Sequence, residues 1–185
     1  MECNLSIQRL TALIVLFALS AVGCQAASPP TAHGTSQPTW QVAFSPSGGA
    51  TQLVVDTLAH AQQTILVQAY SFTSAPIAQA LVEAKRRGVT VKVILDKSQR
   101  TEHYSEADFL VHAGIPVSID AAHSIAHNKV MVIDDETVIT GSFNFTKAAE
   151  EHNAENVLVI YDKTLTDQYT KNWNKHHSHA ELYLR

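Results

Sequence analysis

Short runs rich in β-branched residues alternate with amphipathic helical patterns along residues 40–177, and few architectures accommodate this alternation. The helical segments have apolar residues three and four positions apart, whereas the β-rich runs are four to nine residues long. We expect strands at 40–44, 64–72, 89–95, 115–119, 127–134, 137–140 and 156–161, and helices at 50–62, 76–87, 102–113 and 164–177. This order favours an α/β fold with a mixed β-sheet flanked by helices.

The first 26 residues have the character of a targeting segment. A predominantly apolar run of 13 residues, Leu10 to Val22, follows Arg9. It is shorter than the roughly 20 apolar residues that span a membrane, and it fits the apolar region of a secretory signal peptide. We therefore expect residues 1–26 to be a signal peptide and the protein to be exported to the bacterial periplasm.

The processing of this segment has more than one interpretation. The residues from Ala21 to Cys24 resemble a lipobox, which would make Cys24 the lipid-carrying first residue of a membrane-anchored lipoprotein. Alternatively, the small residues Cys24 and Ala26 suit a peptidase that releases a soluble protein, and a retained anchor is a third alternative.

The remaining chain divides into a linker and one domain. Residues 27–39 are small, polar and proline-rich, which is typical of a linker, and residues 40–185 form the expected catalytic domain. Both cysteines, Cys3 and Cys24, precede that domain, so it has neither a disulfide nor a cysteine nucleophile. The net charge of −4 excludes a generic basic nucleic-acid coat, so a local cluster of residues must hold any anionic substrate.

One segment, residues 127–144, concentrates chemically useful side chains. His127 and Lys129 are two residues apart, which on a strand places both side chains on one face. An imidazole can attack phosphorus while an ammonium offsets the charge on the phosphate oxygens. Ser142 and Asn144 repeat this offset after the next strand and offer a hydroxyl and an amide, and Gly141 permits close backbone approach.

Asp134 does not fit the same cluster. It follows His127 by seven residues, an odd number, so on a continuous strand it points to the opposite face. It would also lie about 23 Å further along that strand. We therefore expect Asp134 to be a structural or turn residue.

Together these residues resemble a known family motif. The pattern consists of His127, Lys129, Asp134, Gly141, Ser142 and Asn144 at their observed spacings. It resembles the complete HKD motif of the phospholipase D superfamily, and the surrounding sequence from Gln41 to Trp173 is similar to the bacterial Nuc-type endonucleases. The resemblance implies a phospholipase D-like sandwich with one HKD copy per chain.

The resemblance also implies roles for individual residues. His127 would be the nucleophile of a covalent phosphohistidine, formed without a metal or other cofactor. Lys129 and Asn144 would bind the phosphate, and Ser142 would support it. Glu155 matches the acidic residue that holds the nucleophilic histidine by its far nitrogen, where a carboxylate fixes the tautomer and stabilises the imidazolium.

A second histidine is needed as general acid and then as base for water. No other histidine in the chain has a lysine two residues later. We therefore expect a homodimer with the site on its twofold axis, because such an interface brings His127 of both subunits together. The sequence indicates no further protein partner.

The motif specifies phosphodiester chemistry but leaves the substrate open. We expect a nonspecific endonuclease that cleaves DNA and also RNA; a phospholipase D or transphosphatidylase and a non-catalytic binding module are the alternatives. Lys97 and Arg100 follow a strand end and are candidates for lining the substrate cleft. Tyr70 ends a strand that could neighbour the motif, but the sequence does not place it.

His176, His177 and His179 cluster near the end of the chain. Such clusters can bind metal. We expect a solvated helix end instead, and no catalytic metal site.

Overall fold

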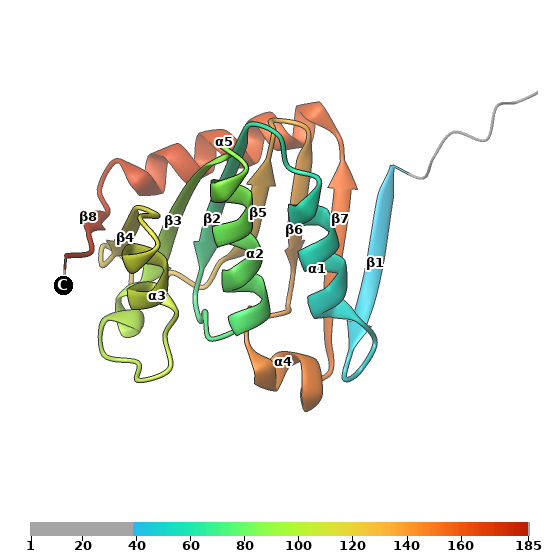
Figure 1. The fold of residues 1–185 in the computed structure, drawn as a ribbon, viewed down its shortest axis with the longest axis horizontal. Helices are drawn as coiled ribbons and strands as arrows, with labels where there is room; N and C mark the ends of the chain where they lie inside the picture. The colour runs from blue at the N-terminus through green and yellow to red at the C-terminus, as the bar shows by residue number, and fades with distance from the viewer. Residues whose placement is uncertain (1–38, 185) are drawn as a thin grey trace, which may run out of the picture. The chain divides into compact units, whose positions relative to one another are not determined.

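The computed structural model describes residues 39–184, which form an eight-stranded sheet with helices against it (Figure 1). The expected signal peptide, the lipobox at Cys24 and nearly all of the linker lie outside these residues. The strands are β1 (Trp40–Ser45), β2 (Thr64–Ala69), β3 (Thr90–Asp96), β4 (Val117–Asp120), β5 (Lys129–Ile133), β6 (Thr137–Gly141), β7 (Glu155–Tyr161) and β8 (Glu181–Leu182).

The sheet is mixed, as the alternation of strands and helices predicts. Its strand order is β1-β7-β6-β5-β2-β3-β4-β8. The β2–β3 and β3–β4 pairs are parallel, and each is connected by a helical crossover, whereas the other pairs are antiparallel. This topology confirms the expected fold class.

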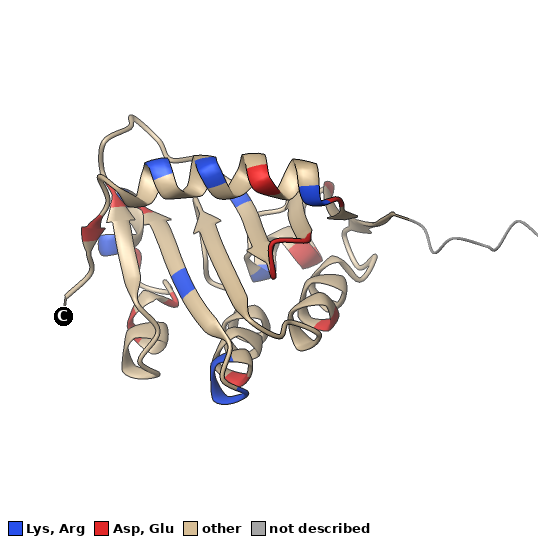
Figure 2. Ribbon diagram, turned by 90° about the horizontal axis from the view of Figure 1, so that it is seen from above, with Lys and Arg blue, Asp and Glu red and all other residues tan. Residues whose placement is uncertain are grey.

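Helices cover both faces of the sheet. On one face lie α1 (Ala50–Ala59), α2 (Ala75–Arg86) and α3 (Ala107–His112), and α5 (Lys163–His177) runs across the other (Figure 2). The indole Nε1 of Trp173 fixes α5 to the sheet by donating to the carbonyl of Val67, 2.9 Å away. The 3₁₀ helix η1 (Lys97–Arg100) and α4 (Lys147–Glu151) follow β3 and β6 respectively.

The central strand β5 is covered from both sides, which explains its composition. All five of its residues are buried, and a strand buried on both faces is normally a continuous apolar run. Lys129 is the exception, since the other four are Val130, Met131, Val132 and Ile133. A buried lysine is rarely retained without a partner or a function.

Several element boundaries differ from the sequence prediction. The strand expected at 127–134 begins at Lys129, because its pairing with β2 ends where Lys129 meets Ala69. The helix expected at 102–113 is reduced to α3, and the preceding turn η1 is capped by the Asp96 carboxylate, which accepts from the backbone N–H of Ser98. The short α4 begins at a Thr146 cap, and neither it nor β8 was expected.

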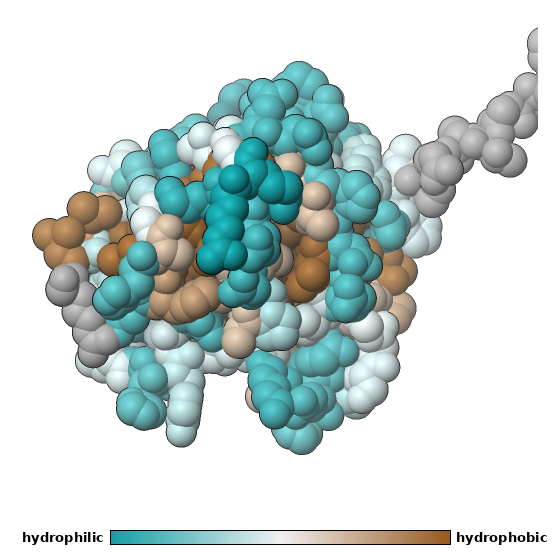
Figure 3. Space-filling view, in the orientation of Figure 1, coloured by the Kyte–Doolittle hydropathy of each residue, from teal (hydrophilic) through white to brown (hydrophobic). Residues whose placement is uncertain are grey.

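No helix within residues 39–184 combines the length and the apolar character needed to cross a bilayer. Apolar surface is nevertheless visible at the margin of the molecule beside β1 (Figure 3). Trp40, Val42 and Phe44 are 54%, 40% and 61% exposed. They alternate along β1 and therefore share one face of the sheet.

Candidate active site

The topology places the ends of four neighbouring strands on one side of the sheet, which we call the motif edge. β2 ends at Ala69 and β6 ends at Gly141, while β5 begins at Lys129 and β7 begins at Glu155. Lys129 pairs with Ala69, and Gly141 pairs with Val157 two residues into β7. This edge therefore carries both halves of the motif, although the chain separates them by a complete hairpin.

His127 and Lys129 are in direct contact at this edge. Lys129 Nζ lies 3.0 Å from His127 Nδ1 and donates to the His127 carbonyl at 2.9 Å. Because an ammonium group can only donate, Nδ1 is the acceptor and the ring proton is on Nε2 in this arrangement. The ring of His127 is exposed, whereas Lys129 is buried, so a substrate reaches the imidazole first and meets a fixed positive charge behind it.

Tyr70 completes this group, and the sequence did not place it. Its ring lies 4.6 Å from the imidazole of His127, centroid to centroid, and 5.3 Å from Lys129 Nζ. Tyr70 directly follows β2, and its backbone N–H donates to Asn128, so the β2–β5 pairing fixes its position. The only sequence signal for this placement was its location at a strand end.

Opposing effects act on the charge of Lys129. Burial lowers the pKa of Lys129, and the negative charge of Glu155 raises it. Burial dominates, so the pKa of Lys129 lies below the ordinary value for lysine. Lys129 must be protonated to neutralise a phosphate, so activity should fall as the pH rises through this lowered pKa.

We expect Glu155→Gln to move the alkaline limb of the kcat/KM profile to lower pH, because it removes the charge that raises the pKa of Lys129. The measurement is kcat/KM as a function of pH, for the wild type and the variant, with a phosphodiester substrate. Glu151→Gln is the control, since Glu151 is an exposed carboxylate that pairs with Lys147 on α4. An unchanged limb, or one moved to higher pH, contradicts the assignment of that limb to Lys129.

Ser142 is held in place by β7. Its Oγ accepts from the backbone N–H of Asn156 at 3.1 Å and from Asn156 Nδ2 at 3.3 Å. The hydroxyl proton of Ser142 is therefore free to donate to a phosphate oxygen. The close approach predicted at Gly141 is made by β7 itself: a Cβ there would lie 2.2 Å from the Asn156 carbonyl oxygen.

Asn144 has a buried side-chain oxygen with no hydrogen-bond partner among residues 39–184. Leaving such an atom unpaired costs about 1–3 kcal/mol. The oxygen and nitrogen of an amide exchange places when the group turns over. The unpaired position is itself buried, so turning the amide over would carry Nδ2 away from any substrate. Phosphate binding by Asn144 therefore needs Nδ2 to face outward, and it stays a prediction.

Glu155 bonds a neighbouring side chain at the start of β7. Its Oε1 accepts from Asn153 Nδ2 at 3.2 Å, and among the described residues no hydrogen bond joins it to His127. Its electrostatic effect is instead on Lys129. Its role as the residue that orients the imidazole stays a prediction.

Lys97 and Arg100 are engaged on the β4 side of the sheet. Lys97 Nζ donates to the His123 carbonyl at 3.0 Å, and Arg100 pairs with Glu181 of β8 at 2.8 Å. β8 is four strands from β5, which corresponds to about 19 Å. The pairing with Glu181 therefore holds Arg100 away from His127, whereas Lys97 is bound to the loop that precedes His127. Substrate binding by Lys97 and Arg100 stays a prediction.

Asp134 lies at the far end of β5 from Lys129. Its carboxylate accepts three backbone hydrogen bonds, from Gln62 at 2.7 Å, Gln63 at 2.7 Å and Thr64 at 2.8 Å. These bonds fasten the connection between α1 and β2. The geometry agrees with the structural role expected from its odd spacing to His127.

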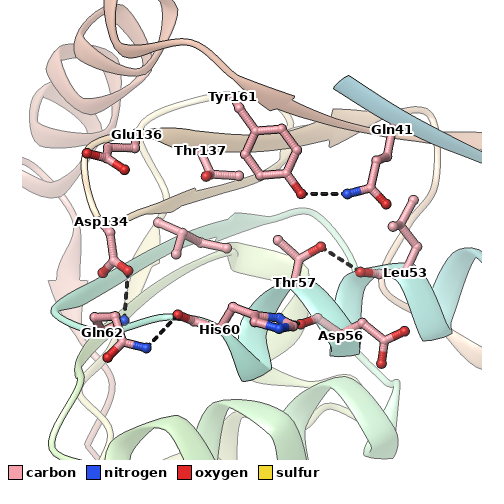
Figure 4. A pocket seen from close by; sticks show the side chains of 11 residues that line it. Gln41, Leu53, Asp56, Thr57, His60, Gln62, Asp134, Glu136, Thr137 and Tyr161 are labelled. Atoms are coloured by element: carbon pink, nitrogen blue, oxygen red, sulfur yellow. Dashed lines mark hydrogen bonds between the residues drawn. The ribbon is translucent and has the colours of Figure 1, made fainter. Parts of the chain in front are cut away.

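A cavity of about 590 Å³ adjoins Asp134 (Figure 4). Its rim includes a hydrogen bond of 2.6 Å from Gln41 Nε2 to the hydroxyl of Tyr161. It lies at the edge of the sheet opposite the motif, and none of the motif residues other than Asp134 lines it. The cavity is therefore separate from the candidate site.

The histidine-rich tail is not the solvated helix end that the sequence predicts. The ring of His176 has a side-chain exposure of only 14%, and its Nδ1 lies 2.7 Å from Oδ2 of the buried Asp120. His179 Nε2 lies 3.2 Å from Oδ1 of the same carboxylate. Only His177 stays apart from it, stacked on Trp173 at 4.7 Å between ring centroids.

Known proteins resemble both the sequence and the fold. Residues 54–177 match the family described as "Cardiolipin synthase, PLD-like domain". A protein named phospholipase D from Rickettsia bellii is 46% identical over 130 residues, covering 70% of this chain and 65% of the relative. The chain thus spans about two thirds of the length of that relative.

Two solved structures share the fold. Nuc from Salmonella typhimurium, described as a phospholipase D family member, superposes with a TM-score of 0.77 at 40% identity, covering 80% of this chain and 100% of Nuc. NucT from Helicobacter pylori gives a TM-score of 0.71 at 23% identity, covering 78% of this chain and 99% of NucT. At that lower identity the NucT match supports the fold alone.

Proposed function

Since this chain belongs to the phospholipase D superfamily, we propose that it is a phosphodiester hydrolase that cleaves nucleic acid through a phosphohistidine at His127. The observation that carries the chemistry is the contact between an exposed imidazole and a buried ammonium, His127 Nδ1 and Lys129 Nζ, 3.0 Å apart. An incoming phosphate oxygen can replace the ring nitrogen as acceptor of the Lys129 proton, which leaves the imidazole free to react.

The reaction proceeds in two displacements. In the first, an imidazole nitrogen of His127 forms a bond to phosphorus, the P–O bond to the leaving group breaks, and a second imidazolium gives that oxygen its proton. In the second displacement, the second imidazole, neutral after giving up its proton, takes a proton from water. The water oxygen then displaces the His127 nitrogen from phosphorus. Lys129, Ser142 and Asn144 stabilise the charge on the non-bridging oxygens in both steps.

The choice of nucleic acid rests on the match to Nuc. This chain covers the whole of Nuc at 40% identity, whereas the rickettsial phospholipase D extends beyond the aligned region. The name of that relative makes a phospholipid diester the second candidate. The net charge of −4 opposes nucleic-acid binding, which depends on positive charge, so the proposal requires a dimer that combines the lysines of both subunits in one groove.

The second imidazole comes from a second copy of the chain. The exposed apolar stripe on β1, formed by Trp40, Val42 and Phe44, supports this step. Phe44 pairs with Asn156, whose side chain contacts Ser142, so the stripe continues on the same face to the motif. A twofold axis that passes beyond the Phe44 end of this stripe, next to Ser142, would bury part of the stripe and turn the two copies of His127 toward each other.

We expect Phe44→Asp to produce a folded monomer whose activity is reduced by about 100-fold or more, because each site loses its general acid. Phe44 is 61% exposed, so the charge should not disturb the fold of one subunit. Light scattering gives the mass, circular dichroism the fold, and plasmid cleavage the activity. Phe109→Asp, at an exposed aromatic residue on α3, is the matched control. A fully active Phe44→Asp monomer would contradict the shared site.

We also propose export, with the protein either free in the periplasm or anchored at Cys24. The support is the apolar run from Leu10 to Val22 in the sequence. Globomycin, which blocks lipoprotein processing, separates the two destinations: an anchored protein accumulates as its precursor, and a released one does not.

The substrate is tested with purified protein in excess EDTA, offered plasmid DNA, RNA and phosphatidylcholine vesicles in parallel. We expect cleavage of DNA, and of RNA, that disappears in His127→Ala. Phospholipid cleavage alone would establish the second candidate. Nucleic-acid binding that is indifferent to His127→Ala, with no turnover, would instead indicate a binding module. Cleavage that requires an added divalent cation at the reacting site would contradict the mechanism.

A further inference from the structure

A second cluster of reactive side chains lies at the β4–β8 side of the sheet. Asp120 ends β4, His123 lies in the loop that follows, and His176 and His179 come from the end of α5 and the turn after it. One potential ligand atom from each of these four residues lies within 4.8 Å of the other three. Two segments of the chain, 120–123 and 176–179, therefore converge on one point.

Asp120 is the centre of this cluster. Its side chain is completely buried, and its Oδ1 accepts from the backbone N–H of Ala122 at 3.0 Å. Burial raises the pKa of Asp120, but the hydrogen bonds from His176, Ala122 and His179 outweigh that effect and hold it below the ordinary value. The carboxylate is thus held in place by donors from its own loop and from α5.

The number of imidazoles exceeds what one carboxylate needs. Asp120 already has two donors in Ala122 and His176, and His179 adds a third. His123 Nε2 lies 3.7 Å from Asp120 Oδ2, the oxygen that His176 also contacts, and this distance is too long for a hydrogen bond. The three rings lie 5.0–5.5 Å apart, centroid to centroid, and are mutually tilted rather than stacked.

A divalent cation resolves this arrangement. We propose that Asp120, His123, His176 and His179 form a structural site for a transition-metal ion of the zinc class. Imidazole nitrogens and carboxylate oxygens are both zinc ligands and their number here suits tetrahedral coordination, whereas magnesium and calcium require oxygen ligands. Four protein ligands leave no open position, so the ion stabilises the fold and does not take part in the reaction.

The required geometry is within reach of these side chains. Zinc–ligand bonds of about 2.0–2.1 Å at a tetrahedral centre place ligand atoms roughly 3.4 Å apart. The rings of His123 and His179, with side-chain exposures of 45% and 33%, can turn inward by the small distance that this demands. The Ala122 N–H that bonds Oδ1 supplies the outer support that metal-binding carboxylates usually have.

The site would connect the end of α5 to the loop that carries the reactive histidine. His123 precedes His127 by four residues, and Lys97 and Asp96 hold the same loop at the His123 carbonyl and the Ala126 N–H. Metal binding therefore adds a third attachment to this loop. Loss of the ion should loosen the loop and the end of α5 without removing any reacting group.

The test uses the full protein, purified without a polyhistidine tag and dialysed against EDTA. We expect it to take up one Zn²⁺ per chain in calorimetry, to be indifferent to Mg²⁺, and to melt at a higher temperature with zinc. Co²⁺ in place of zinc should give the intense visible absorption of a four-coordinate site. His123→Gln and His179→Gln should each weaken zinc binding by about 10-fold or more.

His177→Gln is the matched control, because His177 belongs to the same tail but stacks on Trp173 outside the cluster. It should bind zinc as the wild type does. The proposal is overturned if zinc does not bind, if the His123 and His179 variants bind it unchanged, or if His177→Gln weakens it equally. These readouts are independent of cleavage, so they stand whether or not the protein proves to be a nuclease.

Discussion

Replacing His127 by alanine is expected to lower kcat/KM for the diester by about 10⁴-fold or more, since catalytic groups that act as a unit are lost together. In the proposed dimer this one substitution removes the nucleophile and the general acid at once. The ring is exposed and contacts Lys129 and Tyr70 without filling the core, so the variant should fold normally. Stopped assays on plasmid DNA, with circular dichroism as the folding control, measure both quantities.

The same variant tests whether the two subunits share one site. After wild-type and His127→Ala chains are unfolded and refolded together in equal amounts, half of the wild-type chains sit in mixed dimers. If a site needs both imidazoles, activity per wild-type chain drops to about one half; if each subunit works alone, it stays unchanged. Refolded wild type mixed with Phe109→Asp serves as the control for exchange and losses.

A residual rate near that of the wild type in the pure His127→Ala dimer would contradict the assignment of His127 altogether. Unchanged activity in the mixture, with the pure variant inactive, would contradict only the shared site. The two parts of the proposal can therefore fail separately.

The motif was readable from the sequence because its chemistry depends on short spacings. The two-residue offset between His127 and Lys129 correctly predicted that the side chains meet, even though the strand begins only at Lys129. The contact forms although the strand begins two residues later than predicted, because Asn128 still pairs with the neighbouring strand. Its carbonyl accepts from the backbone N–H of Tyr70. The contact between His127 and Lys129 could therefore be predicted without knowing the strand order of the sheet.

The parts that the sequence did not reveal depend on pairing between distant segments. Tyr70 reaches His127 only because β2 is the neighbour of β5, and a strand end carries no signal of its partner. Likewise, His176 lies 56 residues from Asp120, and it comes close only because α5 crosses the sheet to β4, where β8 then pairs. The sequence around these histidines carries no signal that they pack against a buried carboxylate.

The motif's own aspartate should act on stability and leave the chemistry unchanged. Asp134→Ala removes the acceptor of three backbone N–H groups, those of Gln62, Gln63 and Thr64. Charge-assisted bonds are each worth about 1.5–3 kcal/mol, but the exposed Gln62 and Gln63 N–H groups can bind water instead, so we expect a loss of about 2–4 kcal/mol. For a domain of this size that loss lowers the melting temperature by roughly 10 °C.

The backbone at Asp134 adds to this cost. Its φ of 53° lies in the left-handed region, which aspartate and asparagine tolerate and alanine does not. Asp134→Asn keeps the conformation and one acceptor oxygen, so it should lose about half as much stability as Asp134→Ala. The pair of variants thus separates the hydrogen bonds from the backbone preference.

Activity decides between the structural and the catalytic reading of Asp134. Measured below the melting transition, kcat and KM of both Asp134 variants should match the wild type, because β5 separates this carboxylate from His127. A folded Asp134→Ala protein with an unchanged melting temperature and at least a tenfold lower kcat would place Asp134 in the reaction. Retained kcat with a lowered melting temperature is the outcome that three backbone hydrogen bonds at the far edge of the sheet require.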